Sequence, residues 1–408
     1  MVALMKVWCE QSFPLQIDAI MLLLQGIFFT EIEVKVLLCT MNVGQGLNSI
    51  CNAVAAKLTE MNIQNQVFNV FETAKDREKF NTVTYYRLAK VFPNLLRYFQ
   101  TKSANYNRDL SKKPNPVFLQ KEINILTDVL QEKVKSENFD VIFTPVSSVA
   151  ITANMLKQQG KIDCKIVYCI PDFNLPTYME LCRGVDKIIT NCDENNQNLL
   201  KYNFERETLA QFGLPINEKF FENTNRKILR EKFGLSENDF VVLITSGGAG
   251  FGKTSKMIKR LAQKLENIKF VVVNGKNTKE KQKIDYLIQK YDLNNVLNFG
   301  FCTNMNELMG ISDVILTKTG AATMCECYAK KLPIVTMKQV LYPESDNIKH
   351  LLKYNAAVEC KDLKELEETL EKIFLKELDI NKIEDNYQKL FERNSSKIIA
   401  EMMAKMVE

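Results

Sequence analysis

The sequence predicts an α/β protein built from two Rossmann-like domains, each with a parallel sheet, that face each other across a cleft. Its 408 residues exceed the ~100–200 residues of one ordinary domain. Short apolar runs alternate with segments of helical periodicity, as in a parallel sheet covered by helices. The order of strand, glycine-rich turn and helix also begins twice, at residues 34–61 and 239–265. Such sheets bind ligands at the carboxyl ends of their strands, so the cleft is the expected site.

The apolar runs define the expected strands and, with the segments between them, the domain limits. In the first half they lie at residues 34–40, 65–72, 139–145, 164–172 and 186–191. In the second half they lie at residues 239–246, 269–275, 296–301, 313–320 and 332–338. We expect the following units: an extension at 1–32, a first domain at 33–215 with a basic helical insertion near 76–132, a second domain at 216–384, and a C-terminal helix at 385–408 that could pack back on the first domain.

The composition is that of a globular protein, with 46% hydrophobic and 25% charged residues. The eleven cysteines are scattered and many lie in apolar runs, which fits a reducing cytoplasm better than a disulfide framework. Because His350 is the only histidine, the common Cys/His zinc patterns cannot form, and Cys325 and Cys327 are interpreted as helix packing. We therefore expect no metal and no cofactor. Polar residues interrupt the apolar stretch at 13–29, which argues against a spanning helix there.

Positive charge is concentrated in one segment. Between residues 85 and 113, seven basic side chains accompany one acid, and six aromatic rings are interleaved with them. The basic residues expected to contact a membrane are Arg87, Lys90, Arg97 and Lys102. Anionic headgroups attract such a face by ~1 kcal/mol per cation, which predicts peripheral docking on an anionic membrane. A solvated helix face is one alternative; a nucleic-acid surface is another, although no nucleic-acid motif accompanies the charge.

A glycine-rich turn opens the second domain. Gly247, Gly248 and Gly250 follow an apolar strand and precede an amphipathic helix, a setting in which backbone amides and the helix N-terminus attract phosphate. The same segment fits the phosphate loop of ATPases and GTPases, with Lys253 and Thr254 in the usual roles. That function needs an aspartate at the end of a later strand, and none of the expected strands supplies one. A purely structural turn is the other alternative.

The first domain has its own glycine turn, which contains Gly44, Gly46 and Asn48. It resembles the start of a dinucleotide fingerprint, but Ser49 replaces the third glycine. Glu72, at the end of the next expected strand, could hold a ribose as in NAD enzymes. Acids at strand ends are common, so NAD binding is the weaker interpretation.

A further candidate site begins where Gly320 and Ala321 open a helix that carries Glu326 in its first turns. A carboxylate there can accept hydrogen bonds from both hydroxyls of a ribose, while the nearby amides face phosphate. The alternative is a glutamate that only complements the helix dipole.

The segment "GFCTNMNELMGISDVILTKTGAATMCECYAKKLPIV" resembles the donor domain of the monogalactosyldiacylglycerol synthase and processive diacylglycerol glucosyltransferase family. That family is related to the N-acetylglucosaminyltransferase of lipid II synthesis. A looser similarity runs from about residue 34 to 358, through "VGQGLNS", "YYRLAKVFPNLLRYF", "PDF" and "SGGAG". The resemblance implies a GT-B fold and an inverting transfer of a hexose from a UDP-sugar to a diacylglycerol-like lipid, without a metal, at the cytoplasmic face of the membrane.

By position, the resemblance also assigns roles to individual residues. It places the loop with Gly44, Gly46 and Asn48 on the acceptor side. It assigns the diphosphate to the first glycine turn of the second domain, the uracil to the backbone at Phe301 and Cys302, and the ribose to Glu326. The positions assigned to donor binding are Gly247, Gly248, Gly250, Phe301, Cys302, Gly320, Ala321, Glu326, Glu344, Asp346 and Asn347.

The chain departs from the family pattern where the chemistry needs a base. The histidine that the family has in its first loop is replaced by Leu47. Two further expected histidines are missing, one in a histidine-proline pair where this chain has Pro145-Val146 and one in the stretch 174–176. An inverting transfer needs a base beside the attacking hydroxyl. Asp172, an acid at a strand end, is the candidate, with a structural cap as the alternative. We expect His350 to be a surface or helix histidine.

The leading interpretation is thus a glycosyltransferase acting on a UDP-sugar and a lipid. A second is an altered relative that binds a nucleotide-sugar without lipid glycosylation, which the missing histidines suggest. A nucleotide-sugar epimerase and a phosphate-loop NTPase are further alternatives.

Overall fold

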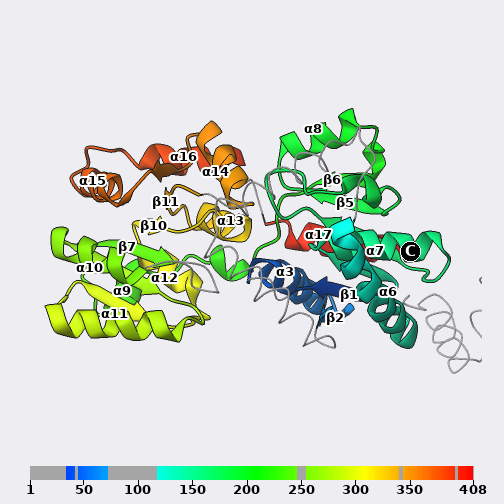
Figure 1. Cartoon of the computed structure of the whole chain (residues 1–408), viewed down its shortest axis with the longest axis horizontal. Helices are drawn as coiled ribbons and strands as arrows, with labels where there is room; N and C mark the ends of the chain where they lie inside the picture. Colours follow the sequence, from blue (N-terminus) through cyan, green and yellow to red (C-terminus); the bar gives the residue numbers. More distant parts are fainter. Residues whose placement is uncertain are drawn as a thin grey trace, which may run out of the picture.

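A computed structural model shows two α/β domains side by side (Figure 1) and describes residues 34–41, 45–71, 117–245, 254–339, 343–390 and 394–407. Each domain contains a six-stranded parallel sheet, so the predicted architecture is confirmed. Along the first strand, Leu37 and Cys39 belong to one apolar core, whereas Val36 and Leu38 belong to another. Both faces of the sheet are therefore covered, which explains the unbroken apolar runs in the sequence.

In the first domain the strand order is β2-β1-β3-β4-β5-β6. Its strands are β1 (Lys35–Thr40), β2 (Gln64–Asn69), β3 (Val141–Thr144), β4 (Lys165–Cys169), β5 (Lys187–Thr190) and β6 (Leu209–Gln211). Its helices are α3 (Gly46–Glu60), α6 (Val117–Glu137), α7 (Ser147–Gln158) and α8 (Asp193–Lys201), with 3-10 turns η2 (Met179–Cys182), η3 (Arg206–Thr208) and η4 (Glu218–Phe220). After β1 the chain forms β2 on one side of it, and β3 to β6 then follow on the other side. The switch point, where the strand order reverses, therefore lies between β1 and β3.

In the second domain the strand order is β12-β11-β10-β7-β8-β9, the doubly wound Rossmann order. Its strands are β7 (Phe240–Thr245), β8 (Ile268–Val273), β9 (Val296–Phe299), β10 (Val314–Leu316), β11 (Ile334–Met337) and β12 (Val358–Cys360). Its helices are α9 (Arg226–Lys232), α10 (Thr254–Lys264), α11 (Thr278–Tyr291), α12 (Met305–Ile311), α13 (Ala321–Ala329), α14 (Glu344–Lys353), α15 (Leu363–Phe374) and α16 (Asn381–Leu390). Here the switch point lies between β7 and β10.

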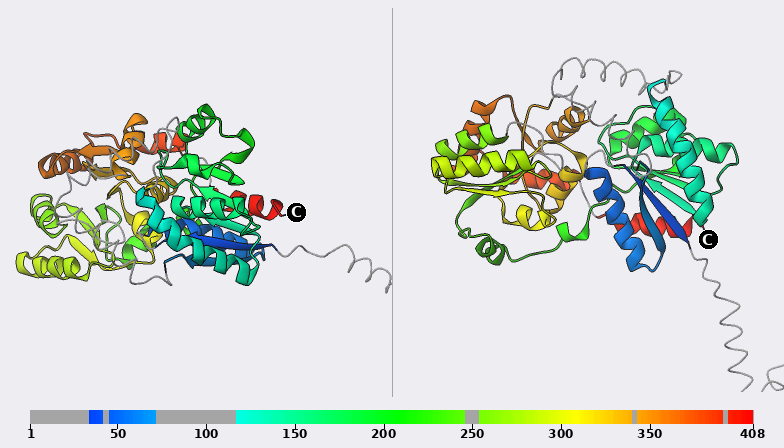
Figure 2. Two further views of the ribbon diagram at one scale, coloured as in Figure 1. Left: turned by 45° about the vertical axis from the view of Figure 1, so that its right-hand side comes forward. Right: turned by 60° about the horizontal axis from the view of Figure 1, so that its bottom comes forward.

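The last helix, α17 (Ser396–Lys405), returns to the first domain and packs against α3 (Figures 1 and 2). The hydroxyl of Ser395 donates to the carbonyl oxygen of Gly213, and that of Ser396 donates to the carbonyl oxygen of Ile216, both at 3.1 Å. The two places where the chain crosses between domains are thereby tied together. One apolar core includes residues of both domains and of α17.

Three sequence expectations fall outside the described residues: the extension at 1–32, the membrane residues Arg87, Lys90, Arg97 and Lys102, and most of the basic insertion. The described end of that insertion is the helix α6. In the parts of the chain that the structure describes, every helix is too short or too polar to span a bilayer.

The packing of α17 can be tested by truncating its buried face. Ile399 is fully buried in the core that joins both domains. We expect Ile399→Ala to lower the free energy of unfolding by about 2–5 kcal/mol, because the substitution leaves a cavity. Lys397, largely exposed on the same helix, is the matched control, and Lys397→Ala should change stability by less than about 0.5 kcal/mol. Equal urea midpoints for both variants would contradict the docking of α17.

Candidate active site

The two domains touch where α3 of the first meets α13 of the second. A Cβ atom added to Gly46 would lie 3.6 Å from the Cβ of Ala322, so the helices approach closely at the start of α3. The hydroxyl of Ser49 reaches across this contact and donates to Oε1 of Glu326 at 3.5 Å. The closed arrangement brings the predicted ribose ligand against the glycine turn of the first domain.

Glu326 faces the first domain and not the interior of its own domain. Its neighbours Cys325 and Cys327 are buried, whereas Glu326 keeps partial exposure at the contact with α3. Burial of the carboxyl raises the pKa of Glu326 to about 8, and the hydrogen bond from Ser49 offsets only part of this effect. Among the described residues, Ser49 is the only side chain that donates to this carboxyl, and at 3.5 Å the bond is long. Two vicinal hydroxyls would supply the donors that the carboxylate lacks.

The turn before α13 is held from several sides. The hydroxyls of Thr245 and Thr317 lie 2.9 Å apart and join the ends of β7 and β10. Thr319 is fully buried, and its hydroxyl donates to the backbone oxygen of Glu344 at 2.8 Å. Next to it, Gly320 caps α13, and among the described residues no atom beyond its chain neighbours would lie within 4 Å of a Cβ atom added there. The N-terminus of α13, with Ala321 first, lies at the switch point, where backbone amides of a helix start can face an anion.

The predicted uracil site lies on the loop after β9. Phe301 is 53% exposed, and the Nζ atom of Lys276 lies 5.9 Å from its ring centroid. Cys302 is partly exposed, and its thiol lies 3.8 Å from the carbonyl oxygen of Gly300. An exposed aromatic ring at the carboxyl edge of the sheet suits a flat base, and base contact by this backbone stays a prediction. The glycines predicted to hold the diphosphate, Gly247, Gly248 and Gly250, and Gly44 of the first loop lie outside the described residues.

The residues predicted on α14 make protein contacts in this closed structure. Glu344 pairs with Lys318 at 2.6 Å. Asp346 accepts hydrogen bonds from Asn174 at 3.1 Å and from Lys349 at 2.8 Å. Asn347 is fully buried and bonds to both domains. Contacts of these three residues with a sugar stay predictions.

Asp172, the predicted base, lies just beyond β4 and faces the second domain. Its Oδ1 atom accepts a hydrogen bond from Nδ2 of Asn347 at 2.9 Å, and its backbone oxygen accepts one from Asn195 at 3.0 Å. Asp172 is partly exposed to solvent. Asp172 is thus a carboxylate at the carboxyl edge of the first sheet, oriented by an amide of the opposite domain; its catalytic role stays a prediction.

The first loop is fixed to the sheet by Asn48, whose Oδ1 atom accepts a hydrogen bond from the hydroxyl of Thr40 at 2.7 Å. Leu47, which stands in place of the family's histidine, packs partly buried against the core of the first domain. A leucine suits this position because it faces apolar neighbours.

One acid near the same edge was not predicted from the sequence. Glu122 on α6 accepts a hydrogen bond from the hydroxyl of Ser148, in the first turn of α7. Burial raises the pKa of Glu122, and the bond from Ser148 opposes that rise. Glu122 is one of several acids on an amphipathic helix, so only the packing of α6 on α7 distinguishes it.

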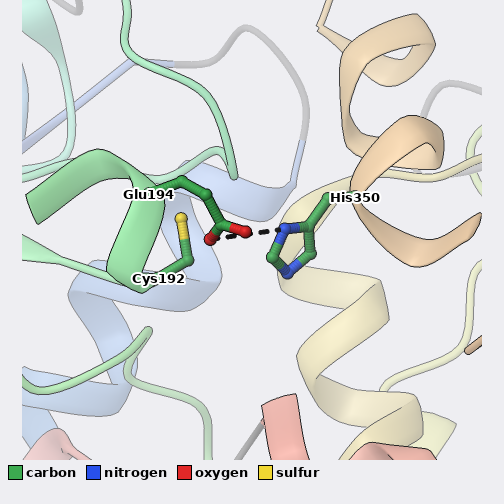
Figure 3. A group of neighbouring side chains, drawn as sticks. All are labelled: Cys192, Glu194 and His350. Carbon is green, nitrogen blue, oxygen red and sulfur yellow. Dashed lines mark ion pairs between the residues drawn. The ribbon is translucent and has the colours of Figure 1, made fainter. Parts of the chain in front are cut away.

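His350 is on a helix, as expected, but it is buried, which corrects the expectation of a surface position. It stacks on Phe173 of the first domain with 4.5 Å between ring centroids. Figure 3 shows it pointing toward Glu194 and Cys192, and its Nδ1 atom lies 4.0 Å from Oε2 of Glu194. The pKa of His350 is lowered by burial, against the influence of Glu194. Its burial follows from domain contact, which no local pattern encodes.

Cys192, Glu194 and His350 form a group in which the atoms that could bind a metal lie within 4.8 Å of one another. Cysteine, histidine and glutamate are zinc ligands. However, Glu194 already binds the ammonium group of Lys353 and the hydroxyl of Tyr354. Burial favours a raised pKa for Glu194, but these bonds outweigh it and lower the pKa to about 2. We therefore interpret the group as an ion pair between domains, and the absence of a metal stays a prediction.

Comparison with protein families gives one match in each domain. The model described as monogalactosyldiacylglycerol (MGDG) synthase matches residues 48–216, and the glycosyltransferase family 28 C-terminal domain matches residues 241–407. The processive diacylglycerol beta-glucosyltransferase of Bacillus subtilis is 24% identical over 384 residues, which covers 92% of this chain and 96% of that protein. The Bacillus licheniformis protein of the same name is 23% identical over 371 residues, with 90% and 93% covered.

Solved structures share the fold at low identity. MurG of Acinetobacter baumannii superposes with a TM-score of 0.55 at 14% identity, covering 91% of this chain and 100% of that chain. HepE of Anabaena in complex with UDP gives 0.54 at 14% identity, with 92% and 99% covered. The UDP-GlcNAc 2-epimerase of Neisseria meningitidis, bound to UDP-GlcNAc, gives 0.53 at 17% identity, with 91% and 99% covered.

The fold is therefore GT-B, as the sequence resemblance implied. Because the two matched models take in most of both domains, and full-length relatives carry the corresponding name, this chain belongs to the monogalactosyldiacylglycerol synthase and processive diacylglycerol glucosyltransferase family of GT-B glycosyltransferases.

Proposed function

We propose that this chain transfers a hexose from a UDP-sugar to a diacylglycerol-like lipid, with inversion at the anomeric carbon. The observation that carries the proposal is the position of Glu326, on the helix that starts at the switch point of the second sheet and at the contact with the first domain. The relatives named processive diacylglycerol beta-glucosyltransferase support the choice of acceptor. The UDP bound by a protein of the same fold supports the choice of donor.

On the donor side, Glu326 would accept hydrogen bonds from the ribose hydroxyls, and the N-terminus of α13 would face the diphosphate. When the bond between the anomeric carbon and the phosphate oxygen breaks, negative charge develops on the leaving diphosphate. Fixed amide dipoles directed at that charge stabilise the transition state. Among the described residues, no atom beyond the chain neighbours of Gly320 lies within 4 Å of a Cβ added there, which supports this placement.

On the acceptor side, the lipid hydroxyl attacks the anomeric carbon and its proton passes to Asp172. Domain closure places donor and acceptor together, which removes part of the entropic barrier. We further propose that the protein works at the inner membrane face, where the residues Arg87, Lys90, Arg97 and Lys102 would bind anionic headgroups.

A second candidate function is nucleotide-sugar binding without lipid glycosylation. Leu47 favours it, because an apolar side chain packed against the core cannot take a proton from an acceptor. The two functions differ in turnover and not in binding.

A transfer assay separates the two functions. The purified chain is incubated with radiolabelled UDP-glucose, UDP-galactose or UDP-N-acetylglucosamine and vesicles of diacylglycerol with anionic phospholipid. We expect labelled glycolipid with one of the three donors, and more of it on anionic than on neutral vesicles. Binding of a UDP-sugar with no labelled lipid would favour the altered relative, and no binding at all would exclude both.

The raised pKa of Glu326 predicts how UDP affinity depends on pH. The free protein holds this carboxyl protonated below about pH 8, whereas hydroxyl donors of the ribose favour its ionised form. UDP affinity should therefore rise by up to about tenfold per pH unit between pH 6 and 8 and level off above that. Calorimetry in buffers of different ionisation enthalpy should also detect proton release on binding. A flat profile, with no proton released, would contradict the assignment.

Substitution of Glu326 tests the same contact without changing pH. We expect Glu326→Gln to weaken UDP binding about 10- to 100-fold at pH 8, because a hydrogen bond to a charged group contributes about 1.5–3 kcal/mol. The UDP affinity of this variant should also depend less on pH than that of the wild type. Glu377→Gln, which removes an exposed acid from the same domain, is the control and should bind like the wild type. Equal affinities for both variants would exclude Glu326 from the donor site.

The base assignment is tested by comparing two acids of the first domain. Asp172→Asn should lower kcat about 10²- to 10⁴-fold while UDP affinity changes little, because an amide cannot accept the proton. Glu122→Gln removes another acid near the carboxyl edge and should leave kcat within about threefold if Asp172 is the base. The reverse result, a loss of kcat in Glu122→Gln alone, would transfer the role to Glu122.

A further inference from the structure

Asn347 joins three segments at the centre of the domain contact. It lies in the first turn of α14 and is 0% exposed. Its Oδ1 atom accepts a hydrogen bond from the backbone amide of Phe173 at 3.1 Å. Its Nδ2 atom donates to Oδ1 of Asp172 at 2.9 Å and to the backbone oxygen of Thr319 at 3.0 Å.

These partners leave the amide a single orientation. A backbone N–H can only donate and a backbone carbonyl can only accept, so Oδ1 must face Phe173 and Nδ2 must face Thr319. Both hydrogens of Nδ2 are then in use, one on each domain. The Asp172 carboxylate is thereby fixed relative to the turn that begins α13.

The segments on either side of this contact are themselves held in place. Thr319 is fully buried and bonded to the backbone of Glu344. On the other side, His350 stacks on Phe173, and Asn174 donates to Asp346. The contact of Asn347 is therefore the buried centre of a row of interactions between the loop after β4 and helix α14.

We propose that Asn347 is a positioning residue that sets the orientation of Asp172 against the donor-side turn and couples it to domain closure. The inference rests on the proposed function, since it assigns a purpose to the Asp172 carboxylate. It differs from a sugar contact, because both amide hydrogens of Asn347 are used by protein in the closed state. A side chain that lacks either the donors or the acceptor breaks one of the three links.

The isosteric variant Asn347→Asp gives the sharpest test. At neutral pH it places a second carboxylate beside Asp172, so the two charges repel and closure is lost. We expect kcat/KM to fall about 100-fold, since small misplacements of reacting groups have effects of this size. As pH falls, one proton shared by the two carboxylates should restore closure, measured as the radius of gyration with UDP bound. The wild-type profile is the reference, because His350, Glu194, Asp346 and the Lys318–Glu344 pair are present in all variants.

The exchange rate of the Phe173 amide hydrogen with solvent reports directly on this contact, because that hydrogen is bonded to Asn347 in the closed state. Its protection should fall at least about tenfold in Asn347→Asp at neutral pH. Should that variant fail to fold, Asn347→Ser removes the same links without a charge and should show the same loss with no recovery at low pH. Asn174→Asp is the matched control, because it places a similar charge beside Asp346, which keeps Lys349 as a partner. In this variant the protection of the Phe173 amide should fall less than about fivefold.

Exchanging the two residues separates positioning from chemistry. In Asp172→Asn with Asn347→Asp, the amide and carboxylate can pair again although the bond to the Thr319 oxygen stays lost, so closure should recover in part while kcat stays as low as in Asp172→Asn alone. Unchanged amide protection and radius of gyration in both Asn347→Asp and Asn347→Ser would overturn the proposal. These readouts need no sugar transfer, so an absence of transfer in the wild type would reject the proposed function and still leave the role of Asn347 to be decided.

Discussion

The structure depends on a buried polar contact between the carboxyl edges of two parallel sheets. Strand ends in both domains carry polar groups because that edge binds ligands, and closure removes some of these groups from water. A buried polar group is costly unless it is paired. Asn347 pairs a carboxylate, an amide and a carbonyl with one side chain. The closed arrangement is specific because few other relative positions of the domains would satisfy all three partners.

Much of the fold could be predicted because the determining pattern is local. The apolar runs that form β1 and β10 are buried on both faces, so periodicity and turn residues sufficed to place them. The strand order was not encoded in any run and was not predicted; it comes from the structure. The return of α17 to the first domain depends on the fit of Ile399 and Met403 against α3, a contact between distant segments.

The residues of the candidate site also differ in how far the sequence could predict them. Glu326 could be predicted because a glycine turn and a helix start fix its surroundings within a few residues. His350 could not be placed, because its burial comes from Phe173, which lies far away in the sequence. Glu122 resembles every other acid on its helix until α6 packs on α7. Local patterns thus place a helix start and its acid, whereas contacts between distant elements stay hidden from the sequence.

The same polar contacts reconcile a closed site with turnover. In the proposed function the domains separate to admit the donor, so the closed state must not be too stable. Neutral hydrogen bonds contribute only about 0.5–1.5 kcal/mol each and those to charged groups about 1.5–3 kcal/mol, since water replaces them on opening. The links of Asn347 and Asn174 can therefore break and re-form at small cost. The two crossing points of the chain are joined through Ser395 and Ser396, and α17 packs on α3. That arrangement suits a hinge at the crossing points and a polar contact that opens opposite it, so that the orientation of Asp172 is restored each time the domains close.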